Sequence, residues 1–231
     1  MIRGKLIVLE GGDGAGKTVQ VDLLHKRIPG LVQVFEFPRY YTSRAGKLVG
    51  ECLVGKHGDF LGLSPYLASL SYTLDRVGAK AMLTKALAEG IVICNRYTPS
   101  NIAHQAAKIS DTKEREAFIE FLEGLEYGEM QLPEPDIVLY LHMPADIASK
   151  LSKNKKKREY LEGSGETEDQ HERDLTYQEK VVRTYLEVAR SRSNWFIIEC
   201  AGSDNTPLPP HVIQEQIWRI VEPCLCLSDK R

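Results

Sequence analysis

The sequence predicts one α/β domain of 231 residues, built on a parallel sheet that is flanked by helices. Short apolar runs rich in β-branched residues alternate along the chain with longer segments whose apolar residues recur at helical spacing. This alternation is typical of right-handed crossovers between parallel strands. Five runs are the expected strands, each interpreted as buried on both faces: residues 6–9, 32–35, 91–94, 137–141 and 195–198.

The expected helices occupy the segments between these strands. They cover residues 65–88, 111–128, 177–189 and 211–221. The first of them is expected to turn one apolar stripe toward the core, made of Leu67, Leu70, Leu74, Val77, Ala81 and Leu83. The second carries Phe118, Phe121, Leu122 and Leu125 at helical spacing.

Two segments interrupt the pattern. Residues 150–173 begin with six basic residues in nine, continue through a short Gly-Ser-Gly stretch and end in acidic residues, which predicts a mobile charged loop. Residues 205–210 contain three prolines and predict a second loop.

Composition limits the class of protein. The 30 Lys and Arg against 32 Asp and Glu give a net charge of −2, which argues against a wholly basic surface for nucleic acid or anionic membranes. The five cysteines are scattered without a CxxC pair, and no apolar run approaches the length of a membrane span. We therefore expect a cytoplasmic protein in a reducing compartment.

Residues 10–18 carry the strongest motif of the chain. They read Glu-Gly-Gly-Asp-Gly-Ala-Gly-Lys-Thr, which matches GxxxxGKT and lies between a predicted strand and a predicted helix. Backbone N–H groups of such a P-loop surround phosphate oxygens, Lys17 reaches the outer phosphates and the Thr18 hydroxyl can bind Mg²⁺. The predicted ATP-binding residues are Gly11, Gly12, Asp13, Gly14, Ala15, Gly16, Lys17 and Thr18. No NKxD motif follows, so a GTPase is disfavoured.

Four further segments, in this order after the P-loop, resemble the thymidylate kinase family: residues 37–40, 72–76, 95–105 and 169–174. The resemblance extends from about residue 4 to residue 189. It implies a P-loop fold of three layers around a five-stranded parallel sheet, with a lid at about 150–173. It also implies a homodimer that phosphorylates dTMP to dTDP with ATP and Mg²⁺, a step of dTTP biosynthesis, and the helix at 65–88 is a candidate for the dimer contact.

The resemblance assigns the dTMP site residue by residue. Tyr72 would stack on thymine, Arg76 would donate to its O4 atom, and the amide of Asn101 would pair with N3. The remaining dTMP-binding residues implied are Asp13, Phe37, Tyr40, Arg96, Ser100, His104 and Gln105. His104 stands where bacterial relatives carry a tyrosine that crowds the ribose 2′ position. From the residues alone, Tyr72 could instead be a core aromatic, Arg76 a solvated arginine and His104 a helical histidine without a role.

The same resemblance implies the catalytic set, which is Asp13, Lys17, Arg96 and Arg158. Arg96 follows a predicted strand at the edge where parallel sheets bind ligands, and there it can bridge acceptor and transferring phosphates. Family members without an arginine in the P-loop carry it on the lid. Because this chain has Gly14 at that place, the lid must supply the charge, and Arg158 is the candidate favoured among the basic residues of 150–158.

The metal site departs from the family pattern. Relatives carry Asp-Arg-Tyr or Asp-Arg-His, whereas residues 95–97 are Asn-Arg-Tyr, so Asn95 brings no charge. Thr18 is the expected Mg²⁺ ligand, with Asp13, Asn95 and Glu172 near it, and Asp169 completes an acidic pair with Glu172. The alternative for that pair is a solvated helix start.

Two other functions remain open from the sequence. One is a deoxynucleoside kinase, or a kinase for another monophosphate, with the same fold. The other is a catalytically weak nucleotide-binding relative, which the Asn95 departure suggests and which the intact Lys17, Thr18 and Arg96 oppose.

Overall fold

The computed structural model describes residues 4–153 and 174–226, and it confirms the predicted parallel sheet. The five strands are all parallel and lie in the order β2-β3-β1-β4-β5. Their bounds are β1 Leu6–Glu10, β2 Val32–Glu36, β3 Ile91–Asn95, β4 Ile137–His142 and β5 Trp195–Glu199.

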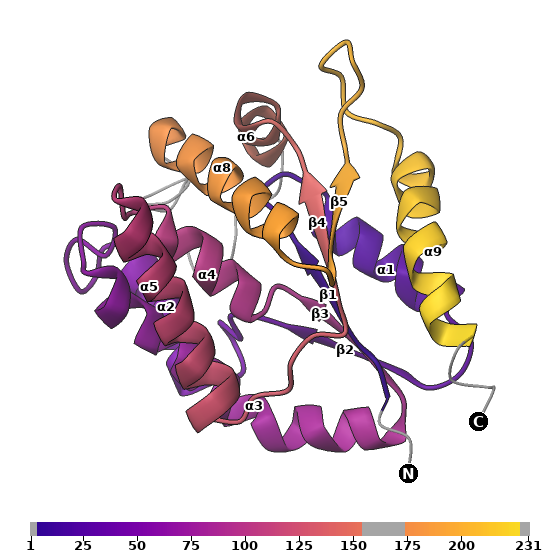
Figure 1. The fold of residues 1–231 in the computed structure, drawn as a ribbon, viewed down its shortest axis with the longest axis horizontal. Coiled ribbons are helices and arrows are strands. Elements are labelled where there is room, and N and C mark those ends of the chain that lie inside the picture. The colour runs from indigo at the N-terminus through magenta and orange to yellow at the C-terminus, as the bar shows by residue number, and fades with distance from the viewer. Residues whose placement is uncertain (1–3, 154–173, 227–231) are drawn as a thin grey trace.

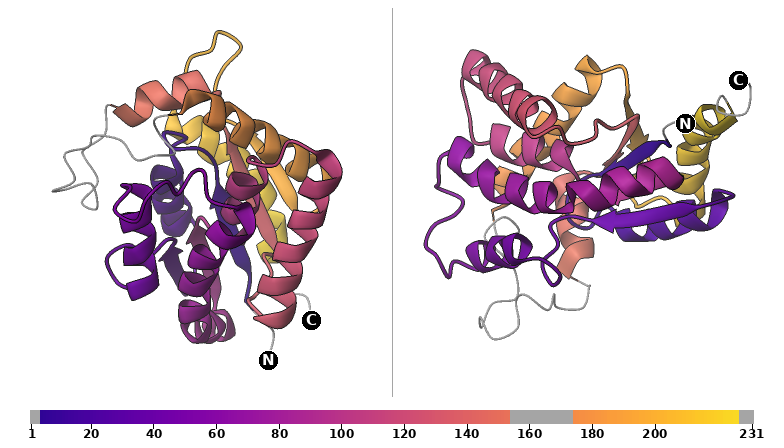
Figure 2. Two further views of the ribbon diagram at one scale, coloured as in Figure 1. Left: turned by 90° about the vertical axis from the view of Figure 1, so that its left-hand side faces the viewer. Right: turned by 90° about the horizontal axis from the view of Figure 1, so that it is seen from below.

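Helices cover both faces of this sheet (Figures 1 and 2). One face packs on α1 Lys17–Arg27, α6 Ala145–Lys153 and α9 Pro210–Cys226. The other packs on α3 Pro65–Glu89, α4 Thr98–Ala106, α5 Thr112–Glu123 and α8 Leu175–Ser191. A further helix, α2 Arg44–Leu53, lies against α3. Each face of the sheet therefore has its own apolar core.

The prediction that every strand is buried on both faces holds for the central strands and is wrong for the two edge strands. All of β1 is buried, whereas Val34 of β2 is 43% exposed and Phe196 and Ile197 of β5 are half-buried. An edge strand has a neighbour on one side alone, so the helices of the two layers cover it less completely.

The predicted apolar stripe of α3 is wrong for four of its six residues: Leu83 is buried and Val77 packs against the core, whereas Ala81 is exposed. Leu67, Leu70 and Leu74 are 59, 40 and 61% exposed, while Asp75 and Arg76 are almost completely buried. The remaining buried residues of this helix are Ala68, Ser69, Thr73, Ala79, Leu83, Ala86 and Leu87. Helical spacing located the helix correctly. It cannot show which face of the helix is buried when polar residues of that face bind buried partners on other elements.

Several boundaries differ from the prediction. The helix expected at 111–128 divides into α5 and a π-helix, η1 Gly124–Glu129. Helices α2, α4 and α6 were not predicted, and α6 takes in residues 150–153 of the expected lid loop. The rest of that loop, with Arg158, Asp169 and Glu172, lies outside the described residues.

Within the described ranges, none of the helices has both the length and the apolar character that crossing a membrane requires.

Candidate active site

The P-loop joins β1 to α1 with the geometry that the motif predicts. Lys17 is 8% exposed, and its side chain folds back over the loop, where Nζ donates to the carbonyl oxygens of Gly11 at 3.0 Å and Gly12 at 2.8 Å. It also lies 4.0 Å from Asp13 Oδ1. The ammonium group is thus held at the mouth of the loop by acceptors that phosphate oxygens can replace.

Two P-loop glycines are required by the backbone. Gly16 precedes α1 with a left-handed φ of 85°, and Gly14 has a φ of 91°. A Cβ atom at Gly14 would lie 2.0 Å from the carbonyl oxygen of Ala148 in α6. This close approach excludes any side chain at position 14, so no arginine can occupy that place without moving α6.

Arg96 lies directly after β3 and faces the P-loop. Its backbone has a left-handed φ of 66°, a strained conformation for a residue with a side chain. The guanidinium donates to Asp13 Oδ1 at 2.8 Å and to Ser100 Oγ at 3.1 Å, and its Nη1 lies 3.4 Å from Nε2 of His104. The structure therefore brings four of the predicted site residues into one cluster.

A buried carboxylate fixes the turn that carries Arg96. Glu10, the last residue of β1, is completely buried and accepts hydrogen bonds from the backbone N–H groups of Tyr97 at 2.8 Å and Ser100 at 3.1 Å. It also accepts from Ser100 Oγ at 2.5 Å and from Tyr185 Oη at 2.8 Å. Burial raises the pKa of Glu10, partly offset by the charge of Arg96 and by these hydrogen bonds.

Asn95 ends β3 beside the last residue of β2. Its Nδ2 donates to Glu36 Oε1 at 3.0 Å, while its Oδ1 is buried and has no partner in the described part of the chain. Among the described residues, no three His, Cys, Asp or Glu side chains form a metal cage. The Thr18 hydroxyl and the Oδ1 atom of Asn95 are oxygens of the kind that can bind Mg²⁺.

Arg76 points into the protein and is 2% exposed, so it is not a solvated arginine. Its Nε donates to Glu126 Oε2 at 2.8 Å, and its Nη2 donates to Glu126 Oε1 at 2.5 Å. Burial disfavours the charge on Arg76, but the adjacent Glu126 carboxylate outweighs burial and raises the arginine pKa. The paired charges allow an arginine to stay ionised inside the protein.

Asn101 joins the same cluster from α4. Its Nδ2 donates to the carbonyl oxygen of Ser69 at 3.1 Å and to Glu126 Oε1 at 3.0 Å. Its Oδ1 is buried without a partner in the described part of the chain. Arg76 and Asn101 thus bind one carboxylate, and both donate to its Oε1 atom.

The aromatic residues separate into two groups. Tyr72 and Tyr40 pack on a small apolar cluster that contains Phe60, and the Phe60 and Tyr72 ring centroids are 5.9 Å apart. Phe37 is 2% exposed and packs in the main core, 5.7 Å from the ring of Tyr97. Tyr72 and Tyr40 are half-buried, which leaves ring area for a base, whereas Phe37 is enclosed by protein.

Arg39 is anchored by Asp75, one residue before Arg76. The backbone N–H and Nε of Arg39 donate to the Asp75 carboxylate at 2.8 and 3.0 Å, and Ser43 Oγ donates to the same group. This network fixes the loop after β2 against α3, beside the aromatic cluster.

His104 and Gln105 both lie on α4. The His104 ring nitrogen Nδ1 is 3.3 Å from Tyr177 Oη, which in turn donates to the His104 carbonyl oxygen at 2.9 Å. Gln105 is fully buried, and neither atom of its amide has a hydrogen-bond partner in the described chain. His104 is thus turned toward Arg96 and α8, whereas Gln105 lies in the interior.

Three carboxylates of the site were missed by the sequence analysis: Glu10, Asp75 and Glu126. Asp75 and Glu126 each lie on a helical segment that otherwise reads as an ordinary amphipathic pattern. For Glu10, the sequence offers one signal of a functional role: a charged residue ends an otherwise apolar strand. The sequence around Glu126 offers no comparable signal.

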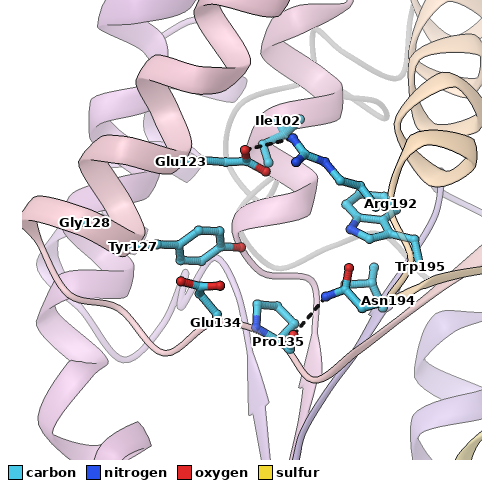
Figure 3. Close-up of a pocket in the computed structure, with 10 residues that line it drawn as sticks. Ile102, Glu123, Tyr127, Gly128, Glu134, Pro135, Arg192, Asn194 and Trp195 are labelled. Atoms are coloured by element: carbon cyan, nitrogen blue, oxygen red, sulfur yellow. Dashed lines mark hydrogen bonds and ion pairs between the residues drawn. The ribbon is translucent and has the colours of Figure 1, made fainter.

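A cavity of about 370 Å³ lies at the other end of the sheet (Figure 3). Its walls include Tyr127, Trp195, Glu123 and Arg192, and the last two form a 2.8 Å ion pair. It adjoins the starts of β4 and β5, whereas the P-loop follows the end of β1. None of the predicted site residues lines it.

Known thymidylate kinases are similar to this chain over most of its length. The thymidylate kinase family model matches residues 9–206. A thymidylate kinase of Mycobacterium tuberculosis is 33% identical over 87% of this chain and 93% of its own length, and one from Danio rerio is 27% identical over 86 and 84%. The structure of a Candida albicans thymidylate kinase superposes with a TM-score of 0.73 at 24% identity, covering 96% of this chain and 92% of that one. The chain belongs to the thymidylate kinase family.

Proposed function

We propose that this protein transfers the terminal phosphoryl group of ATP to dTMP, forming dTDP and ADP, with Mg²⁺ bound to the nucleotide. The observation that carries the proposal is the contact between the two halves of the site. Arg96 lies on the turn from β3 into α4, the helix that carries Asn101, and it reaches the P-loop residue Asp13 at 2.8 Å. One short turn thus links a phosphate cradle to a buried polar cluster of the kind that reads a base edge.

The chain's own residues supply positioning and positive charge. An acceptor phosphate is already an anionic nucleophile, so no general base is needed. Lys17 and Arg96 lie where charge spreads over the transferring group, and each now contacts oxygens that phosphate oxygens can replace. We place Arg158 of the lid in the same role. When bound, Mg²⁺ adds charge neutralisation on the phosphates, and Thr18, Asn95 and Asp13 are the residues that would hold it or its waters.

A panel of acceptors tests the proposal. ADP release should be fastest with dTMP, lower with dUMP by roughly 10- to 200-fold because one methyl contact is lost, and lower still with dCMP. Thymidine belongs in the panel because Glu36, at the end of β2, is a possible general base for a nucleoside hydroxyl. Faster turnover of thymidine than of dTMP would assign the protein to the nucleoside kinases instead, and no ADP release with any acceptor would favour a weak nucleotide-binding relative.

We also propose that two copies of the chain pair through the outer face of α3. Leu67, Leu70 and Leu74 recur there at helical spacing, and Met82 on the same helix is 50% exposed. Contiguous exposed apolar residues of this kind are typical of an interface between proteins.

Light scattering after gel filtration tests the pairing. Leu74→Glu should convert a dimer to a monomer, because the new carboxylate would be buried against leucines of the second copy. Leu31→Glu is the matched control, since Leu31 is 56% exposed but lies before β2. A monomeric unmodified protein, or a dimer that survives Leu74→Glu, would exclude this interface.

A cytoplasmic location stays a prediction from the sequence.

A further inference from the structure

Glu126 is the hub of the hydrogen bonds at the base end of the site. Its carboxylate is completely buried on η1. It accepts from Arg76 through both Nε and Nη2, from Thr73 Oγ1 and Thr98 Oγ1 at 2.7 Å each, and from Asn101 Nδ2 at 3.0 Å. Glu126 lies on a π-helical turn. Such turns are rare in proteins, and those that occur are often found at functional sites.

These contacts fix the direction of the Asn101 amide. Both of its acceptors, Glu126 Oε1 and the Ser69 carbonyl oxygen, face the NH₂ group. Rotating the amide by half a turn would place Oδ1 against two acceptors and lose both hydrogen bonds. The buried Oδ1 is therefore held as the atom that still lacks a partner in the described chain, and it can receive a hydrogen bond.

The same carboxylate fixes the direction of Arg76. Because Nε and Nη2 both bind Glu126, the guanidinium is held in its plane by a fork of two bonds. Nη1 takes part in neither bond, and a guanidinium nitrogen can only donate. The pair Arg76 and Asn101 therefore offers one donor and one acceptor.

We propose that Glu126 is a positioning residue that sets the base selectivity of the site without touching the base. By holding Asn101 so that Oδ1 keeps its capacity to accept, and Arg76 so that Nη1 stays outside the fork, it matches a pyrimidine with a 4-oxo group and an N3–H. A 4-amino pyrimidine presents the reverse pattern, a donor at position 4 and an acceptor at N3, so both contacts become mismatched. This inference rests on the proposed function, because it takes dTMP as the acceptor.

The test uses two nucleotides that differ only at this edge, dTMP and 5-methyl-dCMP. In Glu126→Gln one carboxylate oxygen becomes an NH₂ group, so Arg76 loses one of its two acceptors. We expect kcat/KM for dTMP to fall by roughly 10- to 100-fold and that for 5-methyl-dCMP to change by less than about 3-fold. The ratio of kcat/KM for dTMP to kcat/KM for 5-methyl-dCMP should therefore fall. A loss of the same factor for both nucleotides would show a merely structural role and overturn the proposal.

Thr73→Val is the matched control. It removes one donor to the same carboxylate but leaves both acceptors of Asn101 and both of Arg76 in place. We expect lower thermal stability with an unchanged ratio of dTMP to 5-methyl-dCMP. A change of ratio as large as that of Glu126→Gln would assign selectivity to the burial of the cluster rather than to Glu126.

A measurement on the unmodified protein covers the case in which Glu126→Gln does not fold. The protein is labelled with ¹⁵N-asparagine, and the NH₂ signals of Asn101 are assigned from their absence in Asn101→Ser. We expect these signals to be protected from hydrogen exchange both without ligand and with dTMP. Unprotected signals, or protection that appears only with dTMP, would contradict the fixed amide. The proposed function fails separately, if the unmodified protein does not phosphorylate dTMP.

Discussion

The two ends of the candidate site hold their charged side chains in different ways. At the base end, Arg76 is paired with Glu126 by two hydrogen bonds, and both side chains are at most 3% exposed. At the phosphate end, Arg96 and Asp13 are 15 and 23% exposed, and Lys17 binds carbonyl oxygens of its own loop. The first set of charges is neutralised inside the protein, while the second is less deeply buried.

The proposed function accounts for this difference. A neutral base brings no charge, so an arginine that reads it needs a permanent internal counterion. Phosphates bring several negative charges, so cations there need only weak contacts that the substrate replaces. The base end should therefore determine stability and selectivity, and the phosphate end should determine rate.

The largest effect is expected at the phosphate end. Lys17→Ala should reduce kcat by about 10³-fold or more, because one cation facing the transferring phosphoryl group is lost. Steady-state ADP release measures this, and circular dichroism checks that the variant is folded. Lys26→Ala, on the exposed last turn of the same helix, is the control and should leave kcat unchanged. A folded Lys17→Ala enzyme with normal kcat would refute the P-loop role.

Replacing one arginine at each end of the site compares how much each ion pair contributes to the stability of the protein. Arg76→Met should cost about 3–5 kcal/mol, because it leaves a buried carboxylate unpaired, whereas Arg96→Met should cost less, because Asp13 is 23% exposed. Urea unfolding of the two variants gives both values. Equal losses would mean that the two pairs do not differ as their burial indicates. Arg76→Met combined with Glu126→Met should recover part of the loss.

Acid should affect the base end in a defined direction. Burial alone would raise the pKa of Glu126, but the charge of Arg76 and the hydrogen bonds outweigh it and lower the pKa below 4.5. A depressed carboxyl pKa contributes stability that is present above the unfolded value and is lost as pH falls through the folded value. The free energy of unfolding should therefore drop below about pH 4.5 less steeply in the Arg76→Met, Glu126→Met double variant than in the unmodified protein. Parallel curves would contradict this.

The smallest effect concerns the metal environment. Glu36 accepts from Asn95 at 3.0 Å, so a carboxylate already lies beside the position where relatives carry aspartate. Asn95→Asp should lower the Mg²⁺ concentration for half-maximal rate by a few-fold, at the cost of repulsion from Glu36 when Mg²⁺ is absent. Glu36→Gln should raise that concentration.

Mg²⁺ titrations and melting temperatures with and without Mg²⁺ measure both variants of the metal environment. Unchanged Mg²⁺ dependence in both would place the metal away from this pair.

The sequence by itself determined the sheet and the phosphate cradle. Apolar runs of four or five residues and the GxxxxGKT motif are local signals, since each depends on neighbours along the chain. They also placed Arg96 at the correct edge, because the carboxyl end of a parallel strand is where a sheet binds ligands. The resemblance then named Arg76 and Asn101, which the structure brings to one carboxylate.

Only the tertiary structure decided which polar side chains are buried and what they bind. Arg76 meets Glu126 from 50 residues away, Arg39 meets Asp75 from 36, and Ser100 meets Glu10 from 90. Helical spacing therefore assigned Leu67 and its neighbours to the core and missed the polar face that these pairs turn inward. A buried charge is stable only beside its partner, and the distance between partners along the chain leaves no periodic trace in the sequence.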